Sequence, residues 1–261
     1  MKVCFIGNSH LSAYRGLDVG KTAELDLFGA PNTMMRGLSR QGNRLISTND
    51  RLSEYLAFTS GGQRYVELDA YDGFYIVGLN FGVPAIASIL KDYLTTDMRY
   101  HERSSHLISP AVFADAVDGK LRGSMACGII RLIRETSSKP ITILPTPYVA
   151  ASVRDKGQWK KLRRNADAIL DSYHHTARIL LKELNVQHSP QPATTVCNKV
   201  FTLQRYMRDT FKLQPGEQKK RADDDFQHAN SAYGELVLRD LGLLRARWRD
   251  FPRRLISFSR E

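Results

Sequence analysis

Cysteine is scarce in this 261-residue sequence, and the three cysteines present stand far apart. Cys4, Cys127 and Cys197 form neither the closely spaced pairs that bind zinc nor the dense framework that holds small secreted domains together. We therefore expect reduced thiols, as in a cytoplasmic protein, and no metal site built on cysteine.

Long apolar runs are missing as well. No stretch approaches the ~20 residues needed to span a bilayer. Met1-Lys2-Val3-Cys4 leads directly into an apolar, strand-like run, without the apolar core and cleavage site of a signal peptide. The sequence thus favours a cytoplasmic chain with no transmembrane segment, and its length suffices for a sizeable core.

Positive charge is in excess, and it is unevenly distributed. The net charge is +11, and residues 151–261 carry 22 basic and 13 acidic side chains, against 16 and 14 in residues 1–150. Basic residues cluster at 160–164 and between Arg245 and Arg254, so that 245–261 forms a basic C-terminal tail. We interpret both clusters as solvated surface. The alternative is a surface for phosphate-bearing partners such as anionic lipid or nucleic acid, of which nucleic acid is not the expected partner.

Short strand-like runs alternate with stretches of helical periodicity. Apolar runs predict five strands, at 2–6, 24–28, 73–79, 141–145 and 184–188. Helices are expected over 83–94, 125–133, 166–184 and 231–241, the last ended by Gly242. This alternation predicts a doubly wound α/β domain over 1–244, with a central parallel sheet of about five strands. We interpret the polar, turn-rich segment 38–70 as an insertion or a short hairpin.

A serine follows the first predicted strand directly. Gly7-Asn8-Ser9 places the Ser9 hydroxyl at the carboxyl end of that strand, where open α/β sheets bind their ligands. A helix that begins near His10 would direct its free N–H groups and its positive dipole end at the same point. These are the surroundings that a nucleophilic serine requires.

A base for Ser9 is available near the other end of the sequence. Asp225 and His228 stand three residues apart, just before the final predicted helix. That spacing lets the carboxylate accept the Nδ1–H of the imidazole while Nε2 faces outward to take a proton from a serine. We therefore predict Ser9, His228 and Asp225 as nucleophile, base and orienting acid.

These blocks resemble those of the SGNH or GDSL-type hydrolases, which are esterases and deacetylases with a flavodoxin-like, three-layer α/β/α fold. Gly7-Asn8-Ser9 is similar to their Gly-Asp-Ser block, and Asp225 to His228 is similar to their Asp-x-x-His block. Gly78-Leu79-Asn80 is similar to their Gly-x-Asn-Asp block, with Phe81 in place of the final acid. The resemblance implies that Asn80 and the Ser9 backbone N–H stabilise an oxyanion, and that no metal or organic cofactor takes part.

The family's third oxyanion donor is a backbone N–H after the second strand. In this sequence the corresponding stretch is Phe28-Gly29-Ala30-Pro31-Asn32, and Gly29 is the expected donor. An alignment that places Pro31 at this position would remove the donor, because proline has no N–H. Asn32 would then be recruited instead.

Other candidates for chemistry are weaker. Val19-Gly20-Lys21-Thr22 imitates the end of a phosphate-binding loop, but a strand follows where that motif requires a helix. His10 is expected to pack or to cap the first helix, because side chains adjacent on a helix do not face each other. His174-His175 and the polar segment around His106 are expected to carry no chemistry.

The expected function is therefore that of a serine hydrolase acting on O-acyl esters, such as O-acetyl groups of a carbohydrate or glycan precursor. The basic composition would suit an acidic or phosphorylated substrate. The alternatives are an O-acyltransferase, a non-catalytic ligand-binding protein of the same fold, and an anion-binding protein that acts through its tail. A His228 ring beyond hydrogen-bond reach of Ser9 would favour the non-catalytic alternative.

Overall fold

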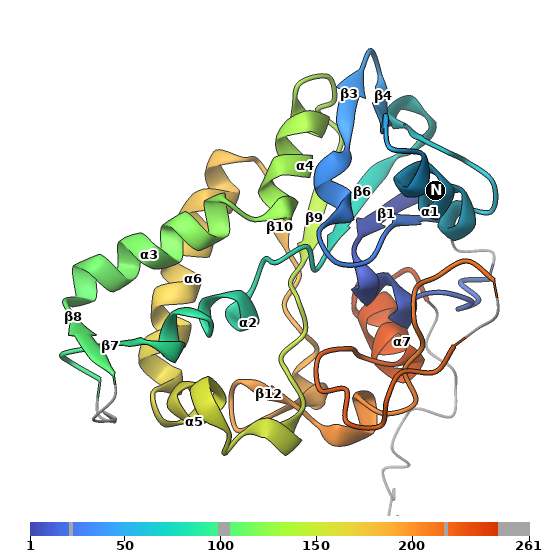
Figure 1. Cartoon of the computed structure of the whole chain (residues 1–261). Helices are drawn as coiled ribbons and strands as arrows, with labels where there is room; N and C mark the ends of the chain where they lie inside the picture. The colour runs from blue at the N-terminus through green and yellow to red at the C-terminus, as the bar shows by residue number, and fades with distance from the viewer. Residues whose placement is uncertain (21–22, 99–104, 217–218, 245–261) are drawn as a thin grey trace, which may run out of the picture.

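A five-stranded sheet forms the centre of the molecule (Figure 1). The computed structural model describes residues 1–20, 23–98, 105–216 and 219–244, so the predicted tail 245–261 lies outside the described residues. The strands of the sheet are β1 (Lys2–Gly7), β2 (Glu24–Gly29), β6 (Gly73–Val77), β9 (Ile141–Leu144) and β10 (Gln187–His188). They stand in the order β10-β9-β6-β1-β2, and every neighbouring pair is parallel. This is the strand order of flavodoxin-like folds, and the predicted α/β class is confirmed.

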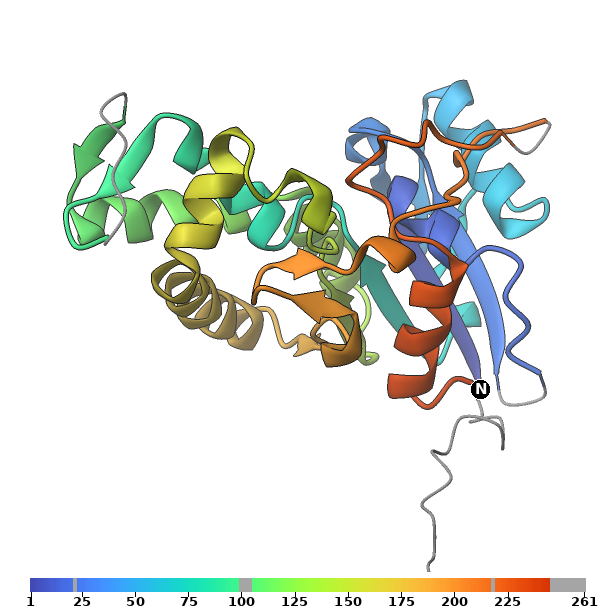
Figure 2. The ribbon, with the colours of Figure 1, turned by 90° about the horizontal axis from the view of Figure 1, so that it is seen from below.

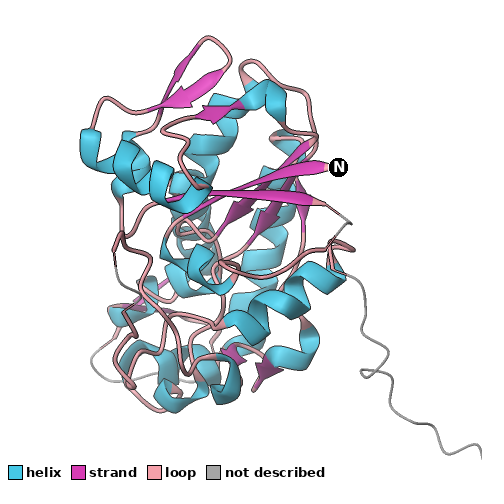
Figure 3. Ribbon diagram, turned by 90° about the vertical axis from the view of Figure 1, so that its right-hand side faces the viewer, coloured by secondary structure: helices cyan, strands magenta, loops and turns pink. Residues whose placement is uncertain are grey.

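Helices cover both faces of the sheet (Figure 3). β1 is buried on both sides, as a central parallel strand requires. Phe5 packs in one apolar cluster with Tyr233 of α7 (Ser231–Asp240). The next residue, Ile6, packs in the other cluster with Leu56 of α1 (Asp50–Ser60) and Ile130 of α4 (Met125–Arg134). The alternation of side chains along β1 therefore joins the two cores.

The remaining helices gather into a lobe beside the sheet (Figure 2). They are α2 (Val83–Ile86), α3 (Pro110–Arg122), α5 (Gly157–Arg164) and α6 (Ala166–Glu183), with α3 packed along α6. Small strands complete the fold: β3 (Ser39–Gln41), β4 (Arg44–Ile46), β5 (Val66–Glu67), β7 (Tyr93–Thr95), β8 (His106–Ile108), β11 (Val196–Cys197) and β12 (Phe201–Thr202). Among the described helices, none combines the length and apolar character that a membrane span needs.

Two predicted segments differ from the structure. The hairpin expected within 38–70 exists as β3 and β4, but the same segment also forms α1, which packs against β2. The prediction of one continuous helix over 83–94 is wrong. The α-helix α2 ends at Ile86 after one turn. A short 3₁₀ helix, η4 (Ile89–Lys91), follows it, and β7 begins at Tyr93. The Ser88 hydroxyl donates to the Ala85 carbonyl, and such local bonds compete with regular helix formation.

The basic cluster at 160–164 is only partly a solvated face. Lys161 is 4% exposed, and its Nζ donates to the carbonyl oxygen of Lys91 at 2.9 Å. Arg163 pairs with Asp155 at 2.7 Å. These two cations therefore help to hold α5 against its neighbours.

A glycine allows the last helix to approach the first. α7 packs on the short 3₁₀ helix η1 (Ser9–Ala13), which follows β1. A Cβ atom at Gly234 would lie 2.0 Å from the carbonyl oxygen of Ala13, a distance that no side chain can occupy. The close approach brings the segment just before α7 to the carboxyl end of β1.

Gly234→Ala is predicted to lower the free energy of unfolding by ~1–3 kcal/mol or more, because the added methyl group collides with rigid backbone. Gly128→Ala is the matched control within α4, where no heavy atom lies within 4 Å of the added Cβ. Since alanine is the better helix former, this control should gain up to ~1 kcal/mol. Urea unfolding followed by circular dichroism measures both, and equal stability of the two variants would contradict the close packing of α7.

Candidate active site

A cavity of about 700 Å³ opens at the carboxyl edge of the sheet. Loops that follow four neighbouring strands line it: Asn8 to His10 after β1, Asn32 and Thr33 after β2, Asn80 after β6, and Thr146 and Pro147 after β9. β1 and β6 are the neighbours at which the strand order reverses, and this is where doubly wound folds bind ligands. The cavity is therefore the candidate site.

Ser9 stands at the first position of η1 and lines the cavity. The residue before it, Asn8, is the N-cap, and its side-chain oxygen accepts the backbone N–H of His10 at 3.4 Å. The backbone N–H of a first helical residue has no acceptor within the helix. For Ser9, no described residue outside the helix accepts this N–H either. The turn thus presents both a hydroxyl and a free N–H to the cavity.

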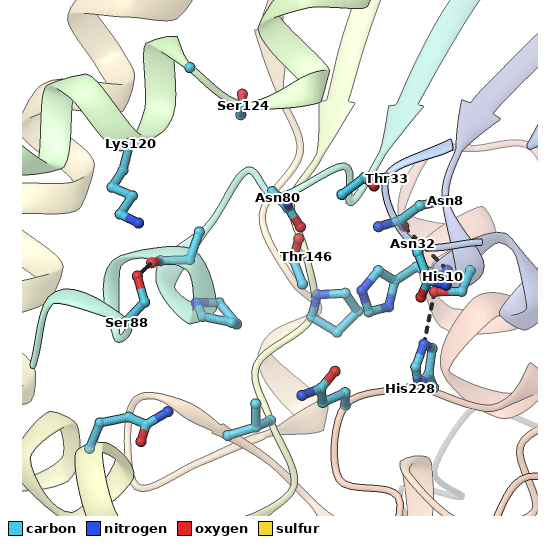
Figure 4. Close-up of a pocket in the computed structure, with 18 of the residues that line it drawn as sticks. Asn8, His10, Asn32, Thr33, Asn80, Ser88, Lys120, Ser124, Thr146 and His228 are labelled. Carbon is cyan, nitrogen blue, oxygen red and sulfur yellow. Dashed lines mark hydrogen bonds between the residues drawn. The ribbon is translucent and has the colours of Figure 1, made fainter. Parts of the chain in front are cut away.

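His228 and Asp225 meet Ser9 as predicted from their spacing. Ser9 Oγ lies 2.9 Å from His228 Nε2, across 219 residues of sequence, and Figure 4 shows this bond as a dashed line. His228 Nδ1 lies 2.9 Å and 3.1 Å from the two carboxylate oxygens of Asp225. A carboxylate selects the tautomer with the proton on Nδ1, so Nε2 accepts the hydroxyl proton of Ser9.

The carboxylate of Asp225 is held in its charged form. One of its oxygens also accepts the backbone N–H groups of Gln227 and His228, at 2.8 Å and 3.1 Å. Burial alone would raise the pKa of this carboxyl, but the bonds from His228 and Gln227 outweigh it and lower the pKa below its ordinary value. The guanidinium of Arg221, 3.6 Å away, is a positively charged neighbour of the same carboxylate. Asp225 therefore stays ionised behind the imidazole.

His10 packs against the base, as expected, and is itself uncharged. Its ring stacks on that of His228, with centroids 5.1 Å apart. Burial, together with the nearby His228, lowers the pKa of His10 to about 3, and its buried Nδ1 has no hydrogen-bond partner among the described residues. His10 thus supplies a neutral surface against which the base is positioned.

Asn80 reaches the cavity from a turn with unusual backbone angles. Gly78, Leu79 and Asn80 have φ values of +69°, +53° and +62°. Glycine and asparagine tolerate this left-handed region, but a buried leucine there is strained, and such strain concentrates at functional sites. A Cβ at Gly78 would lie 2.7 Å from the His10 ring, so the turn can pass this closely only with glycine. The Asn80 side chain is exposed to the cavity and free of partners in the described part of the chain.

The prediction that Gly29 donates to an oxyanion is wrong. Its backbone N–H donates instead to Thr59 Oγ1 of α1 at 3.0 Å, and Gly29 does not line the cavity. A Cβ at Gly29 would lie 2.5 Å from the Gly7 carbonyl oxygen, so its role is close packing of β2 on β1. Asn32 and Thr33, which follow in this loop, do line the cavity, and the groups of Asn32 make no hydrogen bond to another described residue.

Other predicted residues lie apart from the cavity. Phe81, the departure from the family pattern, is fully buried and packs edge-on to Tyr173. The pair His174-His175 is exposed on α6, and His106 lies in β8. Within the described ranges, no three histidine, cysteine or acidic side chains gather where a metal could bind.

No sequence pattern predicted several of the residues that line the cavity. Thr146 Oγ1 is buried without a partner in the described chain, and Trp159 packs on Phe226, two residues before His228. Arg36, Lys91 and Lys120 also line the cavity. They come from separate segments that only the folded chain brings together.

The buried imidazole of His10 predicts acid sensitivity. The folded protein keeps His10 neutral down to about pH 3, whereas the unfolded chain takes up a proton near the ordinary histidine pKa of 6.5. Acidification below that value therefore favours unfolding, by up to ~1.4 kcal/mol per pH unit. His10→Gln should flatten the fall of unfolding free energy between pH 6 and pH 4 by about this slope. Parallel curves for both proteins in urea titrations would refute the buried, neutral state.

No family model matches this sequence, and no curated protein matches it. Among solved structures, the chain is similar to the crystal structure of a DUF4886 family protein from Bacteroides uniformis ATCC 8492. The two share 10% sequence identity, with a TM-score of 0.43, over 95% of this chain and 83% of that chain. A likeness at this level carries no functional argument, so the chemistry of the site rests on the geometry of its own residues.

Proposed function

We propose that the protein is a serine hydrolase that cleaves O-acyl ester bonds through an acyl-enzyme. The supporting observation is the unbroken hydrogen-bond chain from Asp225 through His228 to Ser9, with 2.9 Å between Ser9 Oγ and His228 Nε2. It ends at a cavity large enough for a small organic ester. A His228 ring out of reach of Ser9 would have favoured the non-catalytic alternative, and the observed distance counts against it.

The reaction follows from the roles of these groups. Ser9 Oγ attacks the ester carbonyl while its proton passes to His228 Nε2, and Asp225 stabilises the resulting imidazolium. The tetrahedral intermediate collapses as the imidazolium returns the proton to the departing alcohol oxygen. Water then attacks the acyl-serine with His228 as base, which releases the acid and restores Ser9. Transfer to a hydroxyl acceptor would use the same residues.

Three donors are available to the oxyanion of the intermediate. The Ser9 backbone N–H and the Asn80 amide are the two inferred from the sequence, and Asn32 takes the place of Gly29. A preorganised donor of this kind contributes roughly 3–4 kcal/mol to acyl transfer. The strained turn before Asn80 is consistent with such a role, because it brings Asn80 to the cavity, and backbone strain of this kind concentrates at functional sites.

The polar loops around Ser9 suit a substrate with hydroxyl groups. Asn8, Asn32, Thr33 and Gln227 line this part of the cavity and offer amide and hydroxyl groups. O-acetyl groups of a carbohydrate or glycan precursor are therefore the proposed substrate class. The set of catalytic groups requires no metal or organic cofactor for this chemistry.

A fluorophosphonate probe should label the protein covalently, and Ser9→Ala should abolish the labelling. His228→Ala should reduce it strongly, because the hydroxyl loses its base. Ser12→Ala, on the same short helix, is the matched control and should be labelled like the original protein. Full labelling of Ser9→Ala, detected by mass spectrometry, would sink the proposed nucleophile.

Asn80→Gly is predicted to lower kcat about 10²–10³-fold on a chromogenic acetyl ester, with a small change in KM. Glycine keeps the left-handed backbone of the turn, so the variant removes the amide without adding strain. Asn185→Gly makes the same change at a φ of +52° outside the cavity and should keep the original kcat. A rise in KM alone would assign Asn80 to ground-state binding and not to the oxyanion.

A further inference from the structure

The charged side chains that line the cavity are all positive. They are Arg36, Lys91 and Lys120, and none of the 22 lining residues is acidic, although the chain holds 27 aspartates and glutamates. Asp225, which lies behind His228, does not line the cavity. The cavity wall therefore has a net positive charge that no lining carboxylate compensates.

These cations come from three separate elements. Arg36 belongs to the short helix η2 (Met34–Gly37), Lys91 to η4, and Lys120 to the last turn of α3. Figure 4 shows Lys120 extending from α3 toward Ser88, on the other side of the drawn cavity from His228. Lys120 and the reactive serine thus line different parts of one cavity.

None of the three has an ion pair with another described residue. The carboxylate nearest to Lys120 in sequence, Asp118, is already paired with Arg122 at 2.8 Å. At Lys91, the backbone carbonyl accepts a hydrogen bond from the buried Lys161 ammonium, so the neighbouring charge there is also positive. Like charges gathered without counter-charges repel one another, and an anionic ligand removes that repulsion.

A helix end adds to the positive wall. Ser124 is the N-cap of α4 and lines the cavity between Gly123 and the helix. The N-terminus of a helix carries partial positive charge and favours anions, phosphate above all. η2, which carries Arg36, packs beside α4. The dipole of α4 and the charge of Arg36 therefore act on the same region.

We infer that the substrate of the proposed hydrolase carries a phosphate group, held by Arg36, Lys91 and Lys120 while its acyl ester lies at Ser9. The inference rests on the proposed function for the ester end and on the cavity charges for the anionic end. A phosphate monoester bears nearly two negative charges at neutral pH, whereas a carboxylate bears one. A site with three cations and a helix end therefore suits a phosphate better than a carboxylate. The substrate class is thus an O-acylated, phosphorylated small molecule such as an acylated sugar phosphate.

The anionic end can be tested without catalysis. Glucose phosphate is titrated calorimetrically into Ser9→Ala protein, which has no nucleophile. Lys91→Gln and Lys120→Gln should each weaken binding about tenfold or more, as expected for a bond to a charged group, and added salt should weaken it further. Lys182→Gln, near the end of α6 and outside the cavity, is the matched control and should bind like the parent. Equal affinity of all four proteins would overturn the anion site.

The link to catalysis is tested with acetyl glycerol phosphate and acetyl glycerol, which differ only in the phosphate. The original protein should prefer the phosphorylated ester in kcat/KM, and each lysine variant should lower that preference about tenfold. Hydrolysis of both esters with no preference would overturn the inference and leave the hydrolase intact. Lysine-dependent binding of glucose phosphate without any hydrolysis would instead support the anion site and contradict the proposed function.

Discussion

The contact between α7 and η1 joins a segment near the start of the chain to one near the end of the described residues, and the candidate site depends on this contact. Ser9 begins η1 at the end of β1, whereas His228 precedes α7 by three residues. Gly234 lets α7 approach the Ala13 carbonyl, and the Asn230 side chain caps α7 by accepting the Tyr233 backbone N–H. Without this docking, the serine and its base would stand on unconnected loops. Packing at a glycine therefore helps to set the distance between Ser9 and His228.

The charges of the site are arranged in a consistent order. An ionised Asp225, with Arg221 nearby, lies behind the imidazole of His228, and the uncharged ring of His10 lies against it. Ahead of the serine are donors without partners in the described chain, and the far wall is positive. Negative charge that develops at an ester beside Ser9 would thus meet hydrogen-bond donors that are in place beforehand, which is the condition for electrostatic stabilisation of a transition state.

Much of this arrangement could be predicted from the sequence, and the exceptions have physical reasons. The five strands follow from strand-like runs, and Ser9, Asp225 and His228 from short local patterns, whereas the role of Asn80 was implied by the resemblance to a family block. α1 was missed because it is largely polar and buries only Leu52, Ser53, Leu56 and Thr59. Gly29 was assigned wrongly because nothing in the sequence indicates that Thr59 accepts its N–H. The cations of the cavity wall left no pattern, since they come from segments distant in the chain.

The most direct test of the account is the protonation of the His228 ring itself. Ring ¹⁵N chemical shifts, assigned by comparison with His228→Gln, distinguish a proton on Nδ1 from one on Nε2. At about pH 8, Asp225 should hold the proton on Nδ1 and leave Nε2 as the acceptor for Ser9. A His228 ring with its proton on Nε2 would contradict the central claim, because that nitrogen could not accept the serine proton.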